Sequence, residues 1–176
     1  MKTQWHHPNW SAPKPSAALR ARLLDPTSLT RRLTAECGHF SVRLLAQRRQ
    51  RPYRDEAVLL GLRRGEWALV RRVLLLCDGE PVVYARTVIP PKSLSGPRRR
   101  LLHLGSRSLG GVLFASHSLH RTELQLTRLH PGQPLHREAT AAAGDRAAPV
   151  WGRRSCFTLH GASLLVSEFF LRGEAD

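Results

Sequence analysis

Residues 70–90, VRRVLLLCDGEPVVYARTVIP, constrain the fold of this chain more than any other segment. Asp78-Gly79 predicts a tight turn at the centre, because glycine tolerates positive φ and aspartate caps its own backbone. β-Branched and aliphatic residues fill both arms, which predicts two antiparallel strands joined as a hairpin. Strict alternation then gives the first strand one face that carries Leu69, Arg71, Val73 and Leu75.

Charged residues interrupt the apolar rows of this hairpin and of a segment near the C-terminus. Arg71 and Arg86 stand in rows that are otherwise apolar, and Glu168 stands in such a row within LLVSEFFL. A guanidinium keeps its proton, so a buried arginine needs an anion or access to solvent. Two interpretations stay open. Glu168 forms a structural pair with Arg71 or Arg86, or the charges mark a ligand pocket with a cation at one end and a carboxylate at the other.

The whole pattern predicts an α+β protein with a six-stranded, mostly antiparallel sheet. The expected strands cover residues 39–48, 66–77, 81–89, 119–129, 150–160 and 163–172. Helical spacing and capping residues predict two inserted helical pairs, at about 16–37 and 93–114. Residues 55–66 are expected to be irregular, and 130–149 to form a long connection with one helical turn at 137–143.

The length of 176 residues suits one domain. We expect this domain to cover residues 16–176 and an irregular arm to cover residues 1–15. Trp5 and Trp10 of the arm are expected to pack against the domain.

The chain is strongly basic, with 28 Lys plus Arg, 13 Asp plus Glu and a formal charge of +15. Such a charge suits nucleic acid, an acidic membrane surface or a small anionic ligand that is steered into a pocket. Nearly all the cations are arginine, which a high-GC coding bias would also produce. No aromatic-rich basic face accompanies them, so no nucleic-acid partner is expected.

Three cysteines, Cys37, Cys77 and Cys156, are far apart in the sequence, and no CxxC occurs. This suggests neither a zinc ribbon nor a disulfide framework, so reduced cysteines and a cytoplasmic location are expected. His117 and His120 would lie on opposite faces of a strand, so no metal site is expected there. Residues 1–15 lack the apolar core of a secretory signal, and no apolar run reaches the roughly 18 to 20 residues of a membrane helix.

Several longer stretches, in the same order and spacing, resemble the chorismate–pyruvate lyases (the UbiC family) of ubiquinone biosynthesis. They are CDGEP with ARTVIPPKSLSGP, then LGSRSLGGVLF, then VWGRRSCFTLHG and LLVSEFFL. The match extends over roughly residues 16–172 and is specific in combination. The resemblance implies a single domain in which a six-stranded antiparallel sheet carries two helical flaps over an internal ligand pocket.

The resemblance also implies the reaction, in which chorismate becomes 4-hydroxybenzoate and pyruvate in the first committed step of ubiquinone synthesis. No metal or organic cofactor is expected, because aromatisation of the ring drives the reaction and the protein supplies orientation and electrostatics. The family's carboxylate-binding arginine falls on Arg71, and a slip of one residue would give Arg72. Its acid near the ring hydroxyl falls on Glu168. Its flap positions fall on Leu109 and on Leu29, where the family has methionine.

Arg86, Thr87 and Arg153 lie in matched stretches and are expected to line the pocket less directly. The protein is expected to act as a monomer. Two other functions remain as alternatives. One is a non-enzymatic sensor of aromatic acids with the same fold, although the short first segment leaves no room for a winged helix–turn–helix. The other is a basic nucleic-acid-binding protein, whose binding would weaken steeply with salt.

Overall fold

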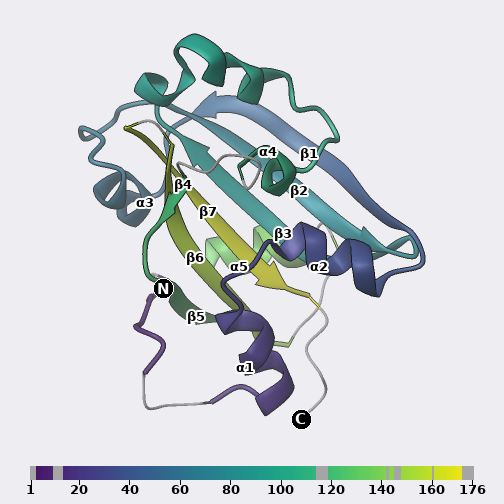
Figure 1. Cartoon of the computed structure of the whole chain (residues 1–176). Helices are drawn as coiled ribbons and strands as arrows, with labels where there is room; N and C mark the ends of the chain where they lie inside the picture. The colour runs from purple at the N-terminus through teal and green to yellow at the C-terminus, as the bar shows by residue number, and fades with distance from the viewer. Residues whose placement is uncertain are drawn as a thin grey trace.

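A twisted antiparallel sheet forms the centre of the molecule (Figure 1). The computed structural model describes residues 3–9, 14–113, 119–141, 143–144, 148–159 and 161–171. Over these ranges the sheet has seven strands in the order β1-β2-β3-β7-β6-β4, and β5 also pairs with β6. The strands are β1 (Phe40–Gln50), β2 (Ala68–Cys77), β3 (Glu80–Ile89), β4 (Leu119–Arg121), β5 (Gln125–Leu129), β6 (Val150–Leu159) and β7 (Ala162–Phe170).

The hairpin of β2 and β3 has the predicted turn. Asp78 and Gly79 have positive φ angles of 52° and 84°, as a type I′ turn requires. The Asp78 carboxylate also accepts a 2.6 Å hydrogen bond from the backbone N–H of His39, just before β1. The turn therefore fixes the register of β2 against β3 and also holds the start of β1.

One predicted strand, 119–129, is divided into β4 and β5. Arg121 pairs with Phe157 and Gln125 pairs with Arg154, so three residues of one chain segment lie opposite two of β6. The extra residue is a bulge, which Thr122 closes through hydrogen bonds to the backbone of Cys156. This division accounts for seven strands in place of the six expected.

Two sets of helices cover one face of the sheet, as the predicted helical pairs require (Figure 1). The first lid consists of α1 (Ala17–Leu24) and α2 (Leu29–Glu36), and the second lid of η1 (Pro91–Leu94), η2 (Gly96–His103) and α4 (Leu109–Leu113). Buried leucines of the first lid pack on Val73 and Ala85, and those of the second on Leu69 and Ile89. Much of the second lid is 3₁₀ rather than α-helix, and an extended Ser95 separates its first two segments.

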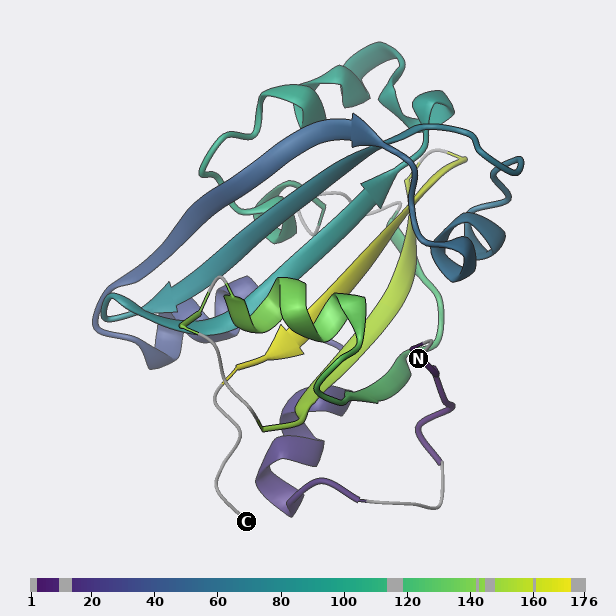
Figure 2. The ribbon, with the colours of Figure 1, turned by 180° about the vertical axis from the view of Figure 1, so that it is seen from behind.

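Two further helices lie outside the lids: α3 (Arg54–Leu59), in a segment expected to be irregular, and α5 (Pro134–Ala141), where one helical turn was expected at 137–143. Helix α5 packs on the opposite face of the sheet, where Leu135 and Ala139 contact the cluster of Leu74 and Phe169 (Figure 2). In the first turn of α3, the Glu56 carboxylate accepts a 2.8 Å hydrogen bond from the backbone N–H of Tyr53, the N-cap residue. Charged residues concealed the helical pattern of α3.

Cys37 and Cys77 form a disulfide, although the sequence analysis expected none. Cys37 directly follows α2, and Cys77 ends β2 at the hairpin turn. Their separation of 40 residues in the sequence hid the fact that the fold brings the end of the first lid over this turn. Cys156 is a free thiol.

The N-terminal arm packs on the sheet over its described part. His6 forms an isolated bridge with Leu126 of β5, and the Trp5 ring lies 6.0 Å from the ring of Phe169. Trp5 therefore packs against the domain as expected, whereas Trp10 lies outside the described residues. The described helices include none with the length and apolar character that crossing a membrane demands. The proposed boundary at residue 15 stays a prediction.

Candidate active site

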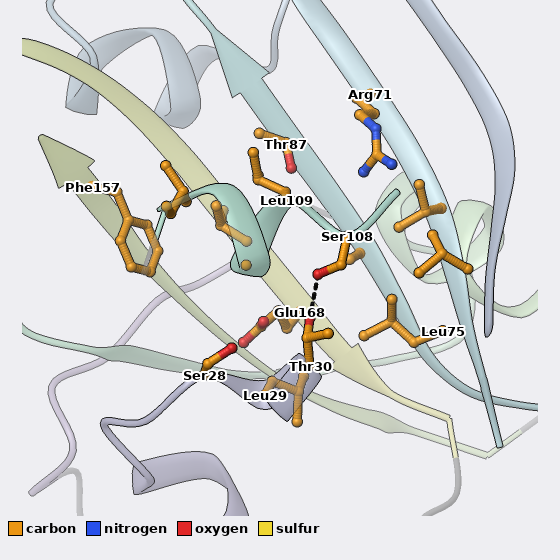
Figure 3. A pocket seen from close by; sticks show the side chains of 16 residues that line it. Ser28, Leu29, Thr30, Arg71, Leu75, Thr87, Ser108, Leu109, Phe157 and Glu168 are labelled. Carbon is orange, nitrogen blue, oxygen red and sulfur yellow. Dashed lines mark hydrogen bonds between the residues drawn. The ribbon is translucent and has the colours of Figure 1, made fainter. Parts of the chain in front are cut away.

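A pocket lies between the central strands and the two lids (Figure 3). Arg71, Thr87 and Glu168 reach it from β2, β3 and β7, and Leu29 and Leu109 reach it from α2 and α4. Its other walls are mainly apolar, with contributions from Val42, Val73, Leu75, Ala85, Leu113, Phe157 and Val166. The space among these side chains measures about 510 Å³, including the part that opens to solvent. Such an apolar pocket with a few polar groups suits a small organic molecule.

Arg71 is a buried cation that points into this pocket (Figure 3). Its Nη2 donates to the carbonyl oxygens of Gly105 and Arg107, at 3.0 and 2.9 Å, and its Nε has no partner. Burial lowers the pKa of Arg71 below its ordinary value, yet a guanidinium stays protonated at neutral pH. None of the ion pairs formed by the described residues includes Arg71. Its charge is therefore available to an anion in the pocket.

Glu168 supplies the only carboxylate among the described residues that line the pocket. It stands on β7 directly opposite Arg153 of β6. The Arg153 Nε donates to Glu168 Oε2 at 2.6 Å, a charge-assisted bond. The pair that the sequence analysis considered, Glu168 with Arg71 or Arg86, is therefore replaced by a pair with Arg153.

The two lids meet over the pocket. Thr30 Oγ1 at the start of α2 and Ser108 Oγ before α4 share a 2.7 Å hydrogen bond (Figure 3). A Cβ on Gly110 would lie only 3.0 Å from Thr30 Oγ1 and 3.1 Å from Ser28 Oγ. Gly110 thus permits the close approach of the two lids.

The structure brings together the four residues named from the sequence: Arg71, Glu168, Leu29 and Leu109 all line one pocket. Arg72, the alternative to Arg71, is absent from the lining. Its Nη1 lies 3.8 Å from a Glu138 oxygen, on the side of the sheet that α5 covers. The registers of β3 with β2 and with β7 therefore place Arg71, and not Arg72, on the pocket face of the sheet.

Of the three secondary candidates, Thr87 lines the pocket and Arg153 reaches it through Glu168. Arg86 lies on the opposite face, where it is 1% exposed. Its Nε and Nη2 donate to both oxygens of Glu56, at 2.7 and 3.0 Å. The expectation that Arg86 lines the pocket is therefore wrong, because alternation along β3 turns it away from Thr87.

Three hydroxyl side chains that line the pocket were not predicted from the sequence, those of Ser28, Thr30 and Ser108. A signal was present for Ser28, whose hydroxyl accepts from the backbone N–H of Arg31 as the N-cap of α2. No group of three or more His, Cys, Asp or Glu side chains is placed to hold a metal ion within the ranges described. His117 lies outside those ranges.

Comparison with known proteins gives a consistent family. A family model described as chorismate lyase matches residues 2–175. A relative from Aromatoleum aromaticum, called probable chorismate pyruvate-lyase, is 45% identical, over 97% of this chain and 96% of the relative. Relatives of the same name from Azoarcus sp. and Methylococcus capsulatus are 46% and 48% identical, and cover 93% and 82% of this chain and 90% and 88% of their own.

Solved structures of similar shape come from transcription regulators. The effector domain of PhnF from Mycobacterium smegmatis has a TM-score of 0.61 at 18% identity, over 84% of this chain and 90% of that domain. A GntR-family regulator from Bacillus cereus has a TM-score of 0.56 at 11% identity, over 78% of this chain and 94% of its own. At these identities the likeness concerns the fold alone.

Proposed function

Because the chain belongs to the chorismate lyase family, we propose that it converts chorismate into 4-hydroxybenzoate and pyruvate. One observation carries this proposal most directly. Arg71 and Glu168 line one largely apolar pocket, and Arg71 has no ion-pair partner among the described carboxylates. Chorismate brings two carboxylates, a ring hydroxyl and an apolar ring, which match these groups.

In the proposed reaction, Arg71 holds the carboxylate on the ring and Glu168 lies near the ring hydroxyl. The ether bond from the ring to the enolpyruvyl group breaks, and the hydrogen on the hydroxyl-bearing ring carbon is lost. The enolpyruvyl methylene gains a proton, so pyruvate leaves and the ring becomes aromatic. Atoms and charges balance without water, oxidant or reductant. The protein therefore needs to supply orientation and a preorganised field, for which fixed charges in an apolar pocket are effective.

The direct test is to incubate the purified chain with chorismate, without added metal and with EDTA, and to follow both products. We expect equal amounts of 4-hydroxybenzoate and pyruvate, formed well above the spontaneous rate. Glu168→Gln should lower the rate at least 100-fold, because it removes the charge with little change in shape. Exposed Glu123 (83% exposed side chain) offers a matched control, and Glu123→Gln should keep the wild-type rate.

Arg71→Gln separates binding from chemistry. We expect it to weaken the affinity for 4-hydroxybenzoate by 10- to 100-fold, since a charged hydrogen bond is worth about 1.5–3 kcal/mol. Arg72→Gln is the control on the neighbouring position, and product affinity should change less than threefold. Equal product affinity in Arg71→Gln and wild type would contradict the proposed role of Arg71.

An aromatic-acid sensor is the second candidate, and the shape of the regulator effector domains favours it. It predicts binding of 4-hydroxybenzoate or a related acid with no turnover of chorismate. Absence of both binding and turnover would leave the strongly basic surface as the lead, to be tested by salt-dependent binding of duplex DNA.

The wider setting belongs to the same proposal. We propose that the reaction serves ubiquinone synthesis, that it takes place in the cytoplasm, and that the active protein is a monomer. Sedimentation tests the last point. The Cys37–Cys77 disulfide argues against the cytoplasmic part of this proposal, because disulfides are rare in reducing compartments such as the cytoplasm. Thiol trapping in freshly lysed cells tests whether this pair is oxidised where the protein acts.

A further inference from the structure

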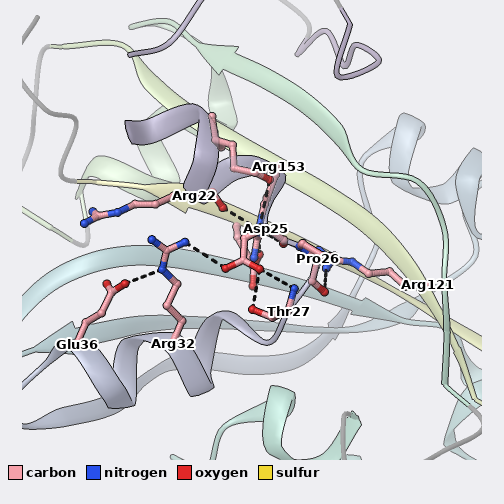
Figure 4. A network of polar contacts seen from close by, with 10 residues as sticks. Arg22, Asp25, Pro26, Thr27, Arg32, Glu36, Arg121 and Arg153 are labelled. Atoms are coloured by element: carbon pink, nitrogen blue, oxygen red, sulfur yellow. Dashed lines mark hydrogen bonds and ion pairs between the residues drawn. The ribbon is translucent and has the colours of Figure 1, made fainter. Parts of the chain in front are cut away.

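Arg153 of β6 joins the carboxylate of Glu168 to the backbone at the base of the first lid. Its Nε donates to Glu168 Oε2 at 2.6 Å. Its Nη1 donates to three carbonyl oxygens, those of Arg22, Leu23 and Asp25, at 3.0, 3.3 and 2.8 Å (Figure 4). The Arg153 side chain is 2% exposed, so these contacts leave it little freedom. One guanidinium thus contacts both the pocket acid and the lid.

The lid segment that Arg153 holds is where α1 ends and the approach to α2 begins. Carbonyl groups at the end of a helix lack partners within it and carry partial negative charge, so a cation is favourable there. A second guanidinium supports the same segment, because Arg121 Nη1 donates to Pro26 O at 2.9 Å (Figure 4). The backbone of residues 22–26 is therefore fixed to the sheet by two arginines.

On the basis of the proposed function, we propose that Arg153 is a positioning residue for the lyase reaction. It orients the Glu168 carboxylate, and it holds the base of the first lid in a fixed position relative to that carboxylate. The planar guanidinium presents donors in several directions, whereas the single nitrogen of lysine cannot reach both sets of acceptors. Closing the first lid and placing the acid therefore depend on the same side chain.

Arg153→Lys tests this proposal, because it retains the charge and removes the fork. We expect a 10- to 100-fold fall in the single-turnover rate with chorismate, in line with the cost of misplacing a reacting group. Product affinity should change less than fivefold, because Arg71 remains in place.

Arg154→Lys is the matched control. Arg154 is the next residue along β6, is 6% exposed, and donates to Asp55 and Gln125 away from the pocket. Its variant should keep the single-turnover rate within threefold of wild type, whatever its melting temperature. A purely structural role for both arginines predicts parallel losses of rate and stability, and that result would overturn the inference.

Two further measurements distinguish positioning from general damage. In the Glu168→Gln background, Arg153→Lys should lower the remaining rate less than threefold, since the carboxylate that it orients is gone. Added guanidinium ion should restore part of the rate of Arg153→Ala, but none of the rate of Glu168→Ala. The positioning role would be contradicted if Arg153→Lys lowered the rate as much in the Glu168→Gln background as in wild type. It would also be contradicted if guanidinium ion restored no activity to a folded Arg153→Ala variant.

Measuring chorismate turnover by the wild-type protein distinguishes failure of this inference from failure of the proposed function. If wild type does not convert chorismate, both fail. If wild type and Arg153→Lys convert it at the same rate, the lyase proposal stands and the role of Arg153 is overturned.

Discussion

Arg71 and Arg86 are two buried arginines of the same sheet with different surroundings. Arg86 is neutralised by Glu56 on the face that α5 covers, whereas Arg71 meets only carbonyl oxygens in the pocket. The sequence shows both as a base in an apolar row. Only the partners distinguish a structural cation from one available to a ligand, and those partners come from segments 30 or more residues away.

At the same scale, Asp25 gives a prediction on pH. Burial alone would raise the pKa of Asp25, but hydrogen bonds from Thr27 and Arg32 outweigh it and hold this pKa below its usual value. The carboxylate therefore adds stability that is complete above pH about 4 and is lost as the pH falls through the lowered folded pKa. Asp25→Asn should lower the free energy of unfolding by about 1 kcal/mol at pH 7 and by less at pH 3. Urea denaturation at the two pH values measures this, and equal losses at both would contradict it.

At the scale of elements, the hairpin, the lids and part of α5 were predictable, whereas α3 was not. The type I′ turn at Asp78-Gly79 and the alternation of β2 are local signals that tertiary contacts did not override. Helix α3 buries Glu56, at 3% exposure, so a residue that marks a surface position in the sequence is part of the interior. The pocket residues came from the family resemblance together with alternation, and the partner of Glu168 required the register of β6 with β7.

The meeting of the lids gives a prediction with a control in the same helix. Gly110→Ala places a methyl group against Thr30 and Ser28 of the first lid, whereas a Cβ on Gly111 has no atom within 4 Å. We expect Gly110→Ala to hold the lids apart and to speed release of 4-hydroxybenzoate by about tenfold, equivalent to about 1.4 kcal/mol. Stopped-flow displacement of the product measures this rate. Gly111→Ala should release product at the wild-type rate, and the same rate in both variants would show that the lids do not meet closely in solution.

At the scale of the whole molecule, a buried charge network joins the sheet to both helices of the opposite side. Arg86 pairs with Glu56 of α3 and lies 3.4 Å from Glu138 of α5. The Tyr53 and Tyr84 hydroxyls donate to the two oxygens of Glu138, at 2.7 and 2.9 Å. Arg86 is fully buried, whereas the Glu138 side chain is 23% exposed, so loss of Glu56 leaves the buried guanidinium with only a longer contact to one partly exposed carboxylate.

Glu56→Gln should therefore destabilise the protein by about 3–5 kcal/mol, the usual cost of removing one partner of a buried ion pair. Chemical denaturation gives this value directly. Glu66 pairs with Arg63 at the surface, where the Arg63 side chain is 95% exposed, so Glu66→Gln should cost less than about 1 kcal/mol. A similar small loss in Glu56→Gln would mean that the buried pair contributes little net stability.

The same network governs the behaviour of the protein in alkali. Burial and the neighbouring Glu138 carboxylate raise the pKa of Tyr53 and of Tyr84 above the ordinary value of 10.0, and the sequence contains no other tyrosine. Protonated tyrosine thus adds stability below pH about 10 that is lost as the pH rises further. Tyrosinate absorbance should appear only together with unfolding. Ionisation of either tyrosine near pH 10 in the folded protein would contradict this.

The disulfide between Cys37 and Cys77 closes a covalent ring that contains all of β1, α3 and β2. Any two residues within that ring are joined by two covalent paths, one along the backbone and one through the disulfide. A single protease cut between residues 38 and 76 therefore yields two pieces that remain one molecule, and they separate on a denaturing gel only after a reducing agent opens the ring.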